Sequence, residues 1–155
     1  PVLSRGLGDV YKRQGVDLSP YFLAVGLYRS QKQNLEINWV HAAAEATGLP
    51  DSSFDLISIF LVCHELPQFA TRKIFQEARR LLRSNGSIAI MDMNPHSEVY
   101  ATMAPHIFTL LKSTEPYLDE YFSLDIEKEL VNAGFAVPKI ICNTHRHRTI
   151  IAGIA

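Results

Sequence analysis

Residues 51–67 read DSSFDLISIFLVCHELP. A polar turn at residues 51–53 leads into an apolar run over residues 56–62. That run is too short to span a bilayer and too uniformly apolar for a strand with one solvent-facing side. It therefore predicts a parallel strand buried on both faces, followed at its carboxyl end by Cys63, His64 and Glu65.

A second strand is predicted directly after this stretch. Apolar periodicity favours a helix over about residues 71–83. Ser84-Asn85-Gly86 then interrupts the pattern before a short apolar strand over residues 87–91, which ends at Asp92. Strand, helix and strand in this order form a βαβ unit, for which we expect a right-handed crossover and an α/β fold class.

Two short motifs flank these strands. Residues 49–55, LPDSSFD, match the Leu-Pro-x-x-x-Phe-Asp entry to the fourth strand of class I S-adenosylmethionine-dependent methyltransferases, and residues 81–86, LLRSNG, match their turn before the fifth. From residue 15 onward the chain resembles this family, in particular the branch related to ubiquinone and menaquinone methyltransferases. The resemblance implies a Rossmann-like, mostly parallel sheet with a C-terminal antiparallel strand pair, S-adenosylmethionine as cofactor and a small-molecule methyl acceptor.

The composition predicts one domain of ordinary solubility. The chain has 155 residues, of which 47% are hydrophobic and 20% charged, and its net charge of −1 gives no argument for binding nucleic acid. A signal-peptide pattern and an apolar run of about 18 residues are both absent from the sequence, so we expect a cytoplasmic protein without stable membrane insertion. Cys63 and Cys142 lie in apolar segments, which favours buried thiols over a disulfide.

The first residues look foreign to the family. Residues 4–14, SRGLGDVYKRQ, are what one reading frame of a common transposon sequencing adaptor encodes, so we expect residues 1–14 to be non-native. The Gly-x-Gly pattern at Gly6 and Gly8 follows no apolar strand and is rejected as a nucleotide loop. Residues 15–155 are then expected to be a partial methyltransferase domain without the family's first strand and glycine-rich loop, and the chain alone is expected to be catalytically inactive.

The predicted cofactor contacts begin at Asp17. Val16-Asp17 is interpreted as a strand end, Ser19 as the N-cap and Pro20 as the first residue of a helix to about residue 30. A carboxylate at such a strand end accepts hydrogen bonds from ribose hydroxyls, which we favour over a simple helix-terminus preference.

Four further residues complete the predicted cofactor contacts. A third strand is predicted over residues 37–41. In the loop after it, the family's adenine-binding Asp is replaced by Ala43, which leaves a backbone contact from Ala44. Phe60 and Leu61, at the end of the apolar strand, are the remaining two predicted contacts.

Residues 94–122 leave the regular pattern. Pro95, Pro105 and Pro116 are expected to break the segment into short helices. The resemblance implies a substrate lid here, while packing over the sheet is an equally favoured role for any one residue. The residues predicted to contact the substrate are Asp92, Asn94, Tyr100 and Phe108.

The C-terminal part is predicted to contain one helix and a hairpin. The helix, over residues 124–133, is closed by Gly134. Strands over residues 135–142 and 149–155 are joined through the polar segment 143–148. Cys142, His145 and His147 match no standard zinc spacing, so a polar turn is predicted there and no metal site.

His64 and Glu65 are the catalytic candidates. Methyl transfer is an in-line displacement, in which positioning dominates and a base is needed only for acidic or hydroxyl acceptors. Histidine suits that role near neutral pH. The alternative is that His64 caps the next helix or pairs with Glu65 at the rim of the sheet.

Two other function classes stay open from the sequence. A nicotinamide-dependent oxidoreductase would use Asp17 for its ribose equally well, but a Tyr-x-x-x-Lys pair is absent and the terminal antiparallel strands are unexplained by it. A non-catalytic domain that binds a partner is the second alternative, because Ala43 and the absent glycine loop indicate a degenerate cofactor site.

Overall fold

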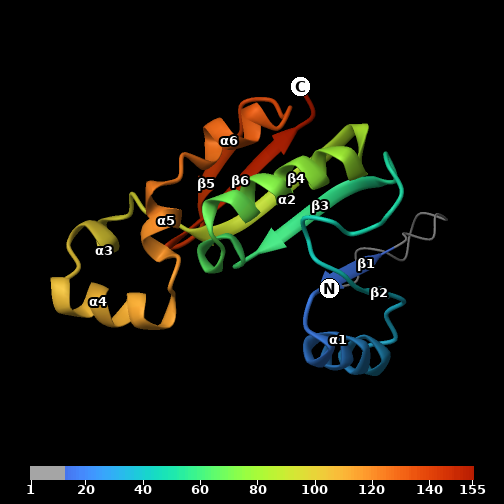
Figure 1. The fold of residues 1–155 in the computed structure, drawn as a ribbon, viewed down its shortest axis with the longest axis horizontal. Coiled ribbons are helices and arrows are strands. Elements are labelled where there is room, and N and C mark those ends of the chain that lie inside the picture. The colour runs from blue at the N-terminus through green and yellow to red at the C-terminus, as the bar shows by residue number, and fades with distance from the viewer. Residues whose placement is uncertain (1–12) are drawn as a thin grey trace. The chain divides into compact units, whose positions relative to one another are not determined.

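The computed structural model describes residues 13–155, and these form two compact units, residues 13–48 and 49–155 (Figure 1). The expectation of a single domain stays a prediction. The strands of the two units belong to separate sheets, one of two strands and one of four. Each unit is described by itself.

The first unit is a small β-α-β element. It contains β1 (Gln14–Asp17), α1 (Pro20–Lys32) and β2 (Asn38–His41), and the two strands pair in parallel. The predicted helix start is confirmed, because the Ser19 hydroxyl accepts the Phe22 amide and Pro20 begins α1. A Cβ added at Gly15 or Gly26 would overlap the Trp39 ring. The unit is thus held together by one indole packed against two glycines.

The second unit contains the predicted βαβ unit and the terminal hairpin. Its sheet has the order β3-β4-β6-β5, with β3 parallel to β4 and β6 antiparallel to both of its neighbours. Its elements are β3 (Phe54–Phe60), η1 (Cys63–Glu65), α2 (Gln68–Leu81), β4 (Leu82–Met93), α3 (Glu98–Ala101), α4 (Pro105–Thr114), α5 (Leu118–Ser123), α6 (Ile126–Asn132), β5 (Lys139–Cys142) and β6 (His147–Gly153). The mixed sheet confirms the predicted fold class.

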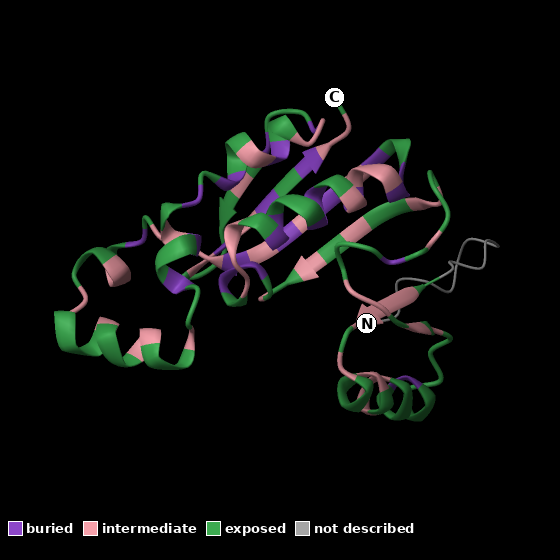
Figure 2. Ribbon diagram, viewed as in Figure 1, coloured by how far each residue is buried: buried purple, intermediate pink, exposed green. Residues whose placement is uncertain are grey.

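The core of this unit lies on one face of the sheet. Residues alternate between buried and less buried positions along β4 and β6, and the buried residues form purple stripes in Figure 2. Helices α2, α5 and α6 supply the facing side chains. The members with the lowest exposure include Phe75, Ile88, Ile90, Leu130, Phe135 and Ile150. Because Asp92 continues the row of Ile88 and Ile90, this alternation carries its carboxylate into the interior.

The turn before β3 is fastened to the end of α2. The amide of Ser52 donates to the Arg80 carbonyl at 3.0 Å, and the amide of Ser53 donates to the Leu81 carbonyl at 2.8 Å. The Arg80 side chain in turn donates to the Leu49 carbonyl and pairs with Asp51. The LPDSSFD motif therefore encodes the junction between β3 and α2.

Two burial predictions are wrong. Strand β3 is not covered on both faces, since Leu56 is 59% exposed and Phe60 is 61% exposed. The reason is that β3 is the outermost strand of its sheet and the helices of this unit pack on the other face. Cys142 is likewise exposed rather than buried, while Cys63 is a buried free thiol.

The segment after β4 forms short helices, as the prolines predicted. Helices α3, α4 and α5 are separate, and Pro105 is the first residue of α4. Helix α6 begins after Asp125, whose carboxylate accepts the Lys128 amide, and it is followed by Gly134 at a φ of 94°. Within residues 13–155, no helix combines the length and apolar character needed to cross a membrane.

Candidate active site

The chain turns sharply where β3 ends. Leu61 has a φ of 53°, a left-handed conformation that costs a residue with a side chain roughly 1–2 kcal/mol. Its amide still donates to the Met91 carbonyl of β4 at 2.9 Å. After this turn, η1 directs Cys63 and His64 into the interior and leaves Glu65 exposed. The strained residue thus places the histidine at the carboxyl ends of both parallel strands.

The Asp92 carboxylate holds this turn in place through hydrogen bonds. Its side chain is completely buried, and its carboxylate accepts three hydrogen bonds. The Cys63 amide donates at 2.9 Å, the Met93 amide at 2.7 Å and the His64 Nδ1 at 2.6 Å. Three donors offset the desolvation of the carboxylate. The last of these bonds fixes a proton on Nδ1 and directs Nε2 away from Asp92.

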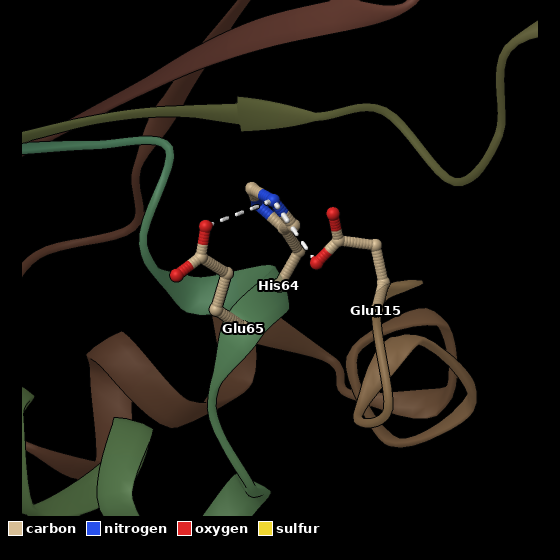
Figure 3. Close-up of side chains that lie close together, drawn as sticks. All are labelled: His64, Glu65 and Glu115. Atoms are coloured by element: carbon tan, nitrogen blue, oxygen red, sulfur yellow. Dashed lines mark ion pairs between the residues drawn. The ribbon is translucent and has the colours of Figure 1, made fainter. Parts of the chain in front are cut away.

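The other ring nitrogen of His64 faces two further carboxylates. Its Nε2 lies 3.9 Å from Glu65 Oε1 and 3.9 Å from Glu115 Oε2. Figure 3 shows the two glutamates reaching the ring from different elements, Glu65 from η1 and Glu115 from the end of α4. The site therefore combines a residue of the sheet's edge with one of the segment predicted as a lid.

Burial and the Asp92 carboxylate shift the pKa values of three groups around Asp92. Its hydrogen bond raises the pKa of His64 above the ordinary histidine value, against the lowering effect of burial. Burial, reinforced by Asp92, raises the pKa of the Cys63 thiol, so this cysteine is held as a thiol rather than a thiolate nucleophile. The pKa of Tyr121 is raised by burial first and by Asp92 second, and its hydroxyl donates to the Met93 carbonyl at 2.7 Å.

An aromatic cluster of Tyr100, Phe108, Tyr121 and Phe122 adjoins the histidine. The ring of Phe122 lies 5.1 Å from Tyr100, 5.6 Å from Phe108 and 6.1 Å from Tyr121, measured between centroids. Tyr121 in turn meets the His64 ring edge to face at 6.3 Å. Two predicted substrate residues, Tyr100 and Phe108, are thereby brought together and linked to His64.

The other two predicted substrate residues are engaged within the protein. The Asp92 carboxylate has no exposed surface and is bound by His64 Nδ1. The Asn94 side chain accepts the His96 amide at 3.2 Å and approaches Cys142 Sγ at 3.8 Å. Their contact with a substrate stays a prediction.

The predicted cofactor residues lie at strand ends and loops. Asp17 is the last residue of β1, and its Oδ1 accepts the Ser19 amide at 2.7 Å. Ala43 is half-buried and bridges to Ala46, while Ala44 is exposed. Phe60 is the last residue of β3 in the second unit, and Leu61 follows it. Their roles stay predictions.

Sequence reasoning missed three residues of the site, Glu115, Tyr121 and Phe122. Glu115 follows α4 in a polar segment that carries no periodic signal, so local sequence gives no reason to single it out. Tyr121 and Phe122 were visible only as two of many aromatic residues between the prolines. A polar turn forms over residues 143–146, shorter than predicted because His147 and Arg148 already belong to β6. Thr144 Oγ1 lies 3.0 Å from His147 Nδ1 across this turn.

Comparison with known families identifies the fold. The family model described as "Methyltransferase domain" matches residues 3–90, more than half of the chain. The chain belongs to this methyltransferase family. The match includes residues 4–14, for which the adaptor origin stays a prediction. No curated protein sequence matches the chain.

Solved structures show the same fold at low sequence identity. A protein from Pyrococcus horikoshii is 12% identical with a TM-score of 0.71, and the alignment covers 93% of this chain and 74% of that one. A SAM-dependent methyltransferase from Aquifex aeolicus is 18% identical with a TM-score of 0.71, covering 93% and 69%. Phosphoethanolamine N-methyltransferase 2 of Haemonchus contortus, solved with S-adenosyl-L-methionine, is 18% identical with a TM-score of 0.72, covering 91% and 43%.

Proposed function

We propose that this methyltransferase domain transfers a methyl group from S-adenosylmethionine to a small-molecule acceptor held beside His64. The observation that carries the proposal is the His64–Asp92 pair at the carboxyl ends of β3 and β4, in a chain of the methyltransferase family. Open α/β sheets place their ligands at this edge. The quinone-related branch is the proposed subfamily, on the resemblance of the chain from residue 15 onward, whereas the motifs at residues 49–55 and 81–86 point to the wider class I family.

The cofactor is proposed to be held through its ribose by Asp17. Because Oδ1 accepts the Ser19 amide, the carboxylate has a fixed orientation at the end of β1. A carboxylate has further acceptor capacity for hydroxyl groups. Ala44 of the same unit adds an exposed backbone for the adenine. Phe60, whose ring is exposed, is proposed separately as a cofactor contact of the second unit. When bound, S-adenosylmethionine supplies a methyl group activated by its positively charged sulfur.

The acceptor is proposed to lie between His64 and the aromatic cluster. Tyr100 and Phe108 provide apolar contact area, and the reacting group lies on the Nε2 side of His64. The rigid support from Asp92 matters because small misplacements of the reactants are costly in a displacement reaction. The Glu65 carboxylate lies 3.9 Å from His64 Nε2, and Glu65 is proposed to assist His64.

The decisive experiment is calorimetric titration of the full-length gene product with S-adenosylhomocysteine and, separately, with NADH. Binding of S-adenosylhomocysteine alone is the expected result, since the family match favours methyl transfer over hydride transfer. Binding of NADH alone would assign the chain to the oxidoreductase class. Binding of neither would leave a degenerate domain and overturn the proposal.

A further inference from the structure

We propose that His64, Glu65 and Glu115 bind a divalent first-row metal ion. This inference deepens the proposed function and rests on it for the role of the ion, which would hold the methyl acceptor. The binding site itself lies wholly within residues 49–155, so its existence can be tested without the cofactor.

The spacing of the three side chains fits a metal ion. One ligand atom from each residue lies within 4.8 Å of the other two. Three atoms at such separations share a point no farther than about 2.8 Å from each, while zinc bonds to histidine and carboxylate are about 2.0–2.2 Å. Rotation of the two glutamate side chains closes this difference, because Glu65 is exposed and Glu115 follows a helix end.

A second observation supporting a metal site is the orientation of the His64 ring. His64 is only 6% exposed, and its Nδ1 is bound to Asp92, so Nε2 is aimed between the two glutamates. A ligating histidine characteristically donates its other ring nitrogen to a carboxylate, which fixes the tautomer and strengthens the ligand. Asp92 is itself held by the Cys63 and Met93 amides, so this support is rigid.

The charge balance also favours a cation. Glu65, Glu115 and Asp92 place three carboxylates around one imidazole, and Nε2 meets two of them at 3.9 Å, too far for a hydrogen bond. A divalent ion bound by Nε2 and the two glutamates would give each of these three ligands a positively charged partner.

The ligand types narrow the class of ion. One imidazole nitrogen with two carboxylate oxygens suits manganese, iron or zinc, whereas calcium and magnesium prefer oxygen ligands alone. Three protein ligands also leave coordination positions open, as in catalytic zinc sites. An acceptor oxygen bound there would be held and polarised beside His64.

The test is calorimetric titration of the metal-free 155-residue chain with zinc chloride and, separately, manganese chloride. One ion per chain with a dissociation constant of about 1–10 μM is expected. Glu115→Gln and His64→Gln should each weaken binding by at least about tenfold. The matched controls are Glu98→Gln and His106→Gln, exposed residues of the same segment that should leave affinity unchanged.

A further variant separates a built site from surface binding. Asp92→Asn keeps all three ligands and should weaken metal binding by about 10–100-fold, with folding checked by circular dichroism. Unchanged affinity in Glu115→Gln and His64→Gln, or no binding up to about 1 mM metal, would overturn the inference. Retained binding of S-adenosylhomocysteine by the full-length product would then leave the methyltransferase function standing, whereas metal binding without it would reject only that function.

Discussion

At the scale of single residues, His64 is fixed at one ring nitrogen and available at the other. Asp92 holds Nδ1 at 2.6 Å, and Nε2 faces Glu65 and Glu115. This arrangement supports the proposed role of His64 at the acceptor, whether His64 touches the acceptor directly or through a bound ion. It gives no reason for His64 to contact the cofactor.

His64→Ala should therefore lower turnover and spare cofactor affinity. We expect kcat to fall by about 10²–10⁴ relative to the parent enzyme, with the dissociation constant of S-adenosylhomocysteine nearly unchanged. His106→Ala, an exposed histidine in α4, is the control. An equal loss of cofactor binding, or a lower melting temperature with turnover retained, would assign His64 to structure.

Asp17→Ala should weaken the binding of the cofactor. A carboxylate that accepts ribose hydroxyls contributes about 1.5–3 kcal/mol, so S-adenosylmethionine should bind roughly ten- to a hundredfold more weakly by calorimetry. Asp17 also accepts a hydrogen bond from the Ser19 amide, so the loss of that bond must be separated from the loss of the ribose contact. Asp17→Asn is the control, because its amide oxygen can keep the bond to Ser19. An unchanged dissociation constant in Asp17→Ala would refute the ribose role.

Sequence patterns identify the parts of the site that lie at strand ends and miss the rest. His64 and Asp92 each follow an apolar strand, and neighbouring parallel strands end at the same edge, so their proximity is predictable. Glu115 is predictable from neither periodicity nor spacing. It reaches His64 through the irregular path of α3 and α4, which tertiary packing decides.

At the scale of elements, the family motif at residues 49–55 proves to be a packing device. Its amides cap the end of α2, and Arg80 clamps it from the helix side. This explains why the motif predicted the fold well and says little about the acceptor. The apolar run over residues 56–62 overestimated the burial of β3. The hydrophobicity of a strand does not show which strands and helices pack against it.

The first unit offers a sharp test at this scale. Gly26 in α1 lies against Trp39, and an added Cβ would overlap the ring. Gly26→Ala should destabilise the protein by about 1–3 kcal/mol through overpacking, despite the better helix propensity of alanine. Gly153→Ala is the matched control, because a Cβ there meets nothing within 4 Å. Urea unfolding followed by tryptophan fluorescence measures both, and equal stabilities would contradict the packing.

At the scale of the whole molecule, the family match from residue 3 to 90 includes parts of both compact units. The order of strands and helices from residue 15 onward was predictable, since hydrophobic periods, prolines and glycines mark the elements and side chains cap α1 and α6. The division into two sheets was not, because pairing between strands depends on contacts distant in sequence.

The stability of the larger unit should depend on the one face of its sheet that is covered. Phe75 and Phe69 both belong to α2, yet Phe75 is 0% exposed in the core and Phe69 is 63% exposed. Phe75→Ala should cost about 3–5 kcal/mol, since it removes a buried ring and leaves a cavity. Phe69→Ala should stay within about 0.5 kcal/mol of the parent. Both are measured by urea denaturation with circular dichroism, and a comparable loss in the two variants would show that α2 buries a different face from the one described.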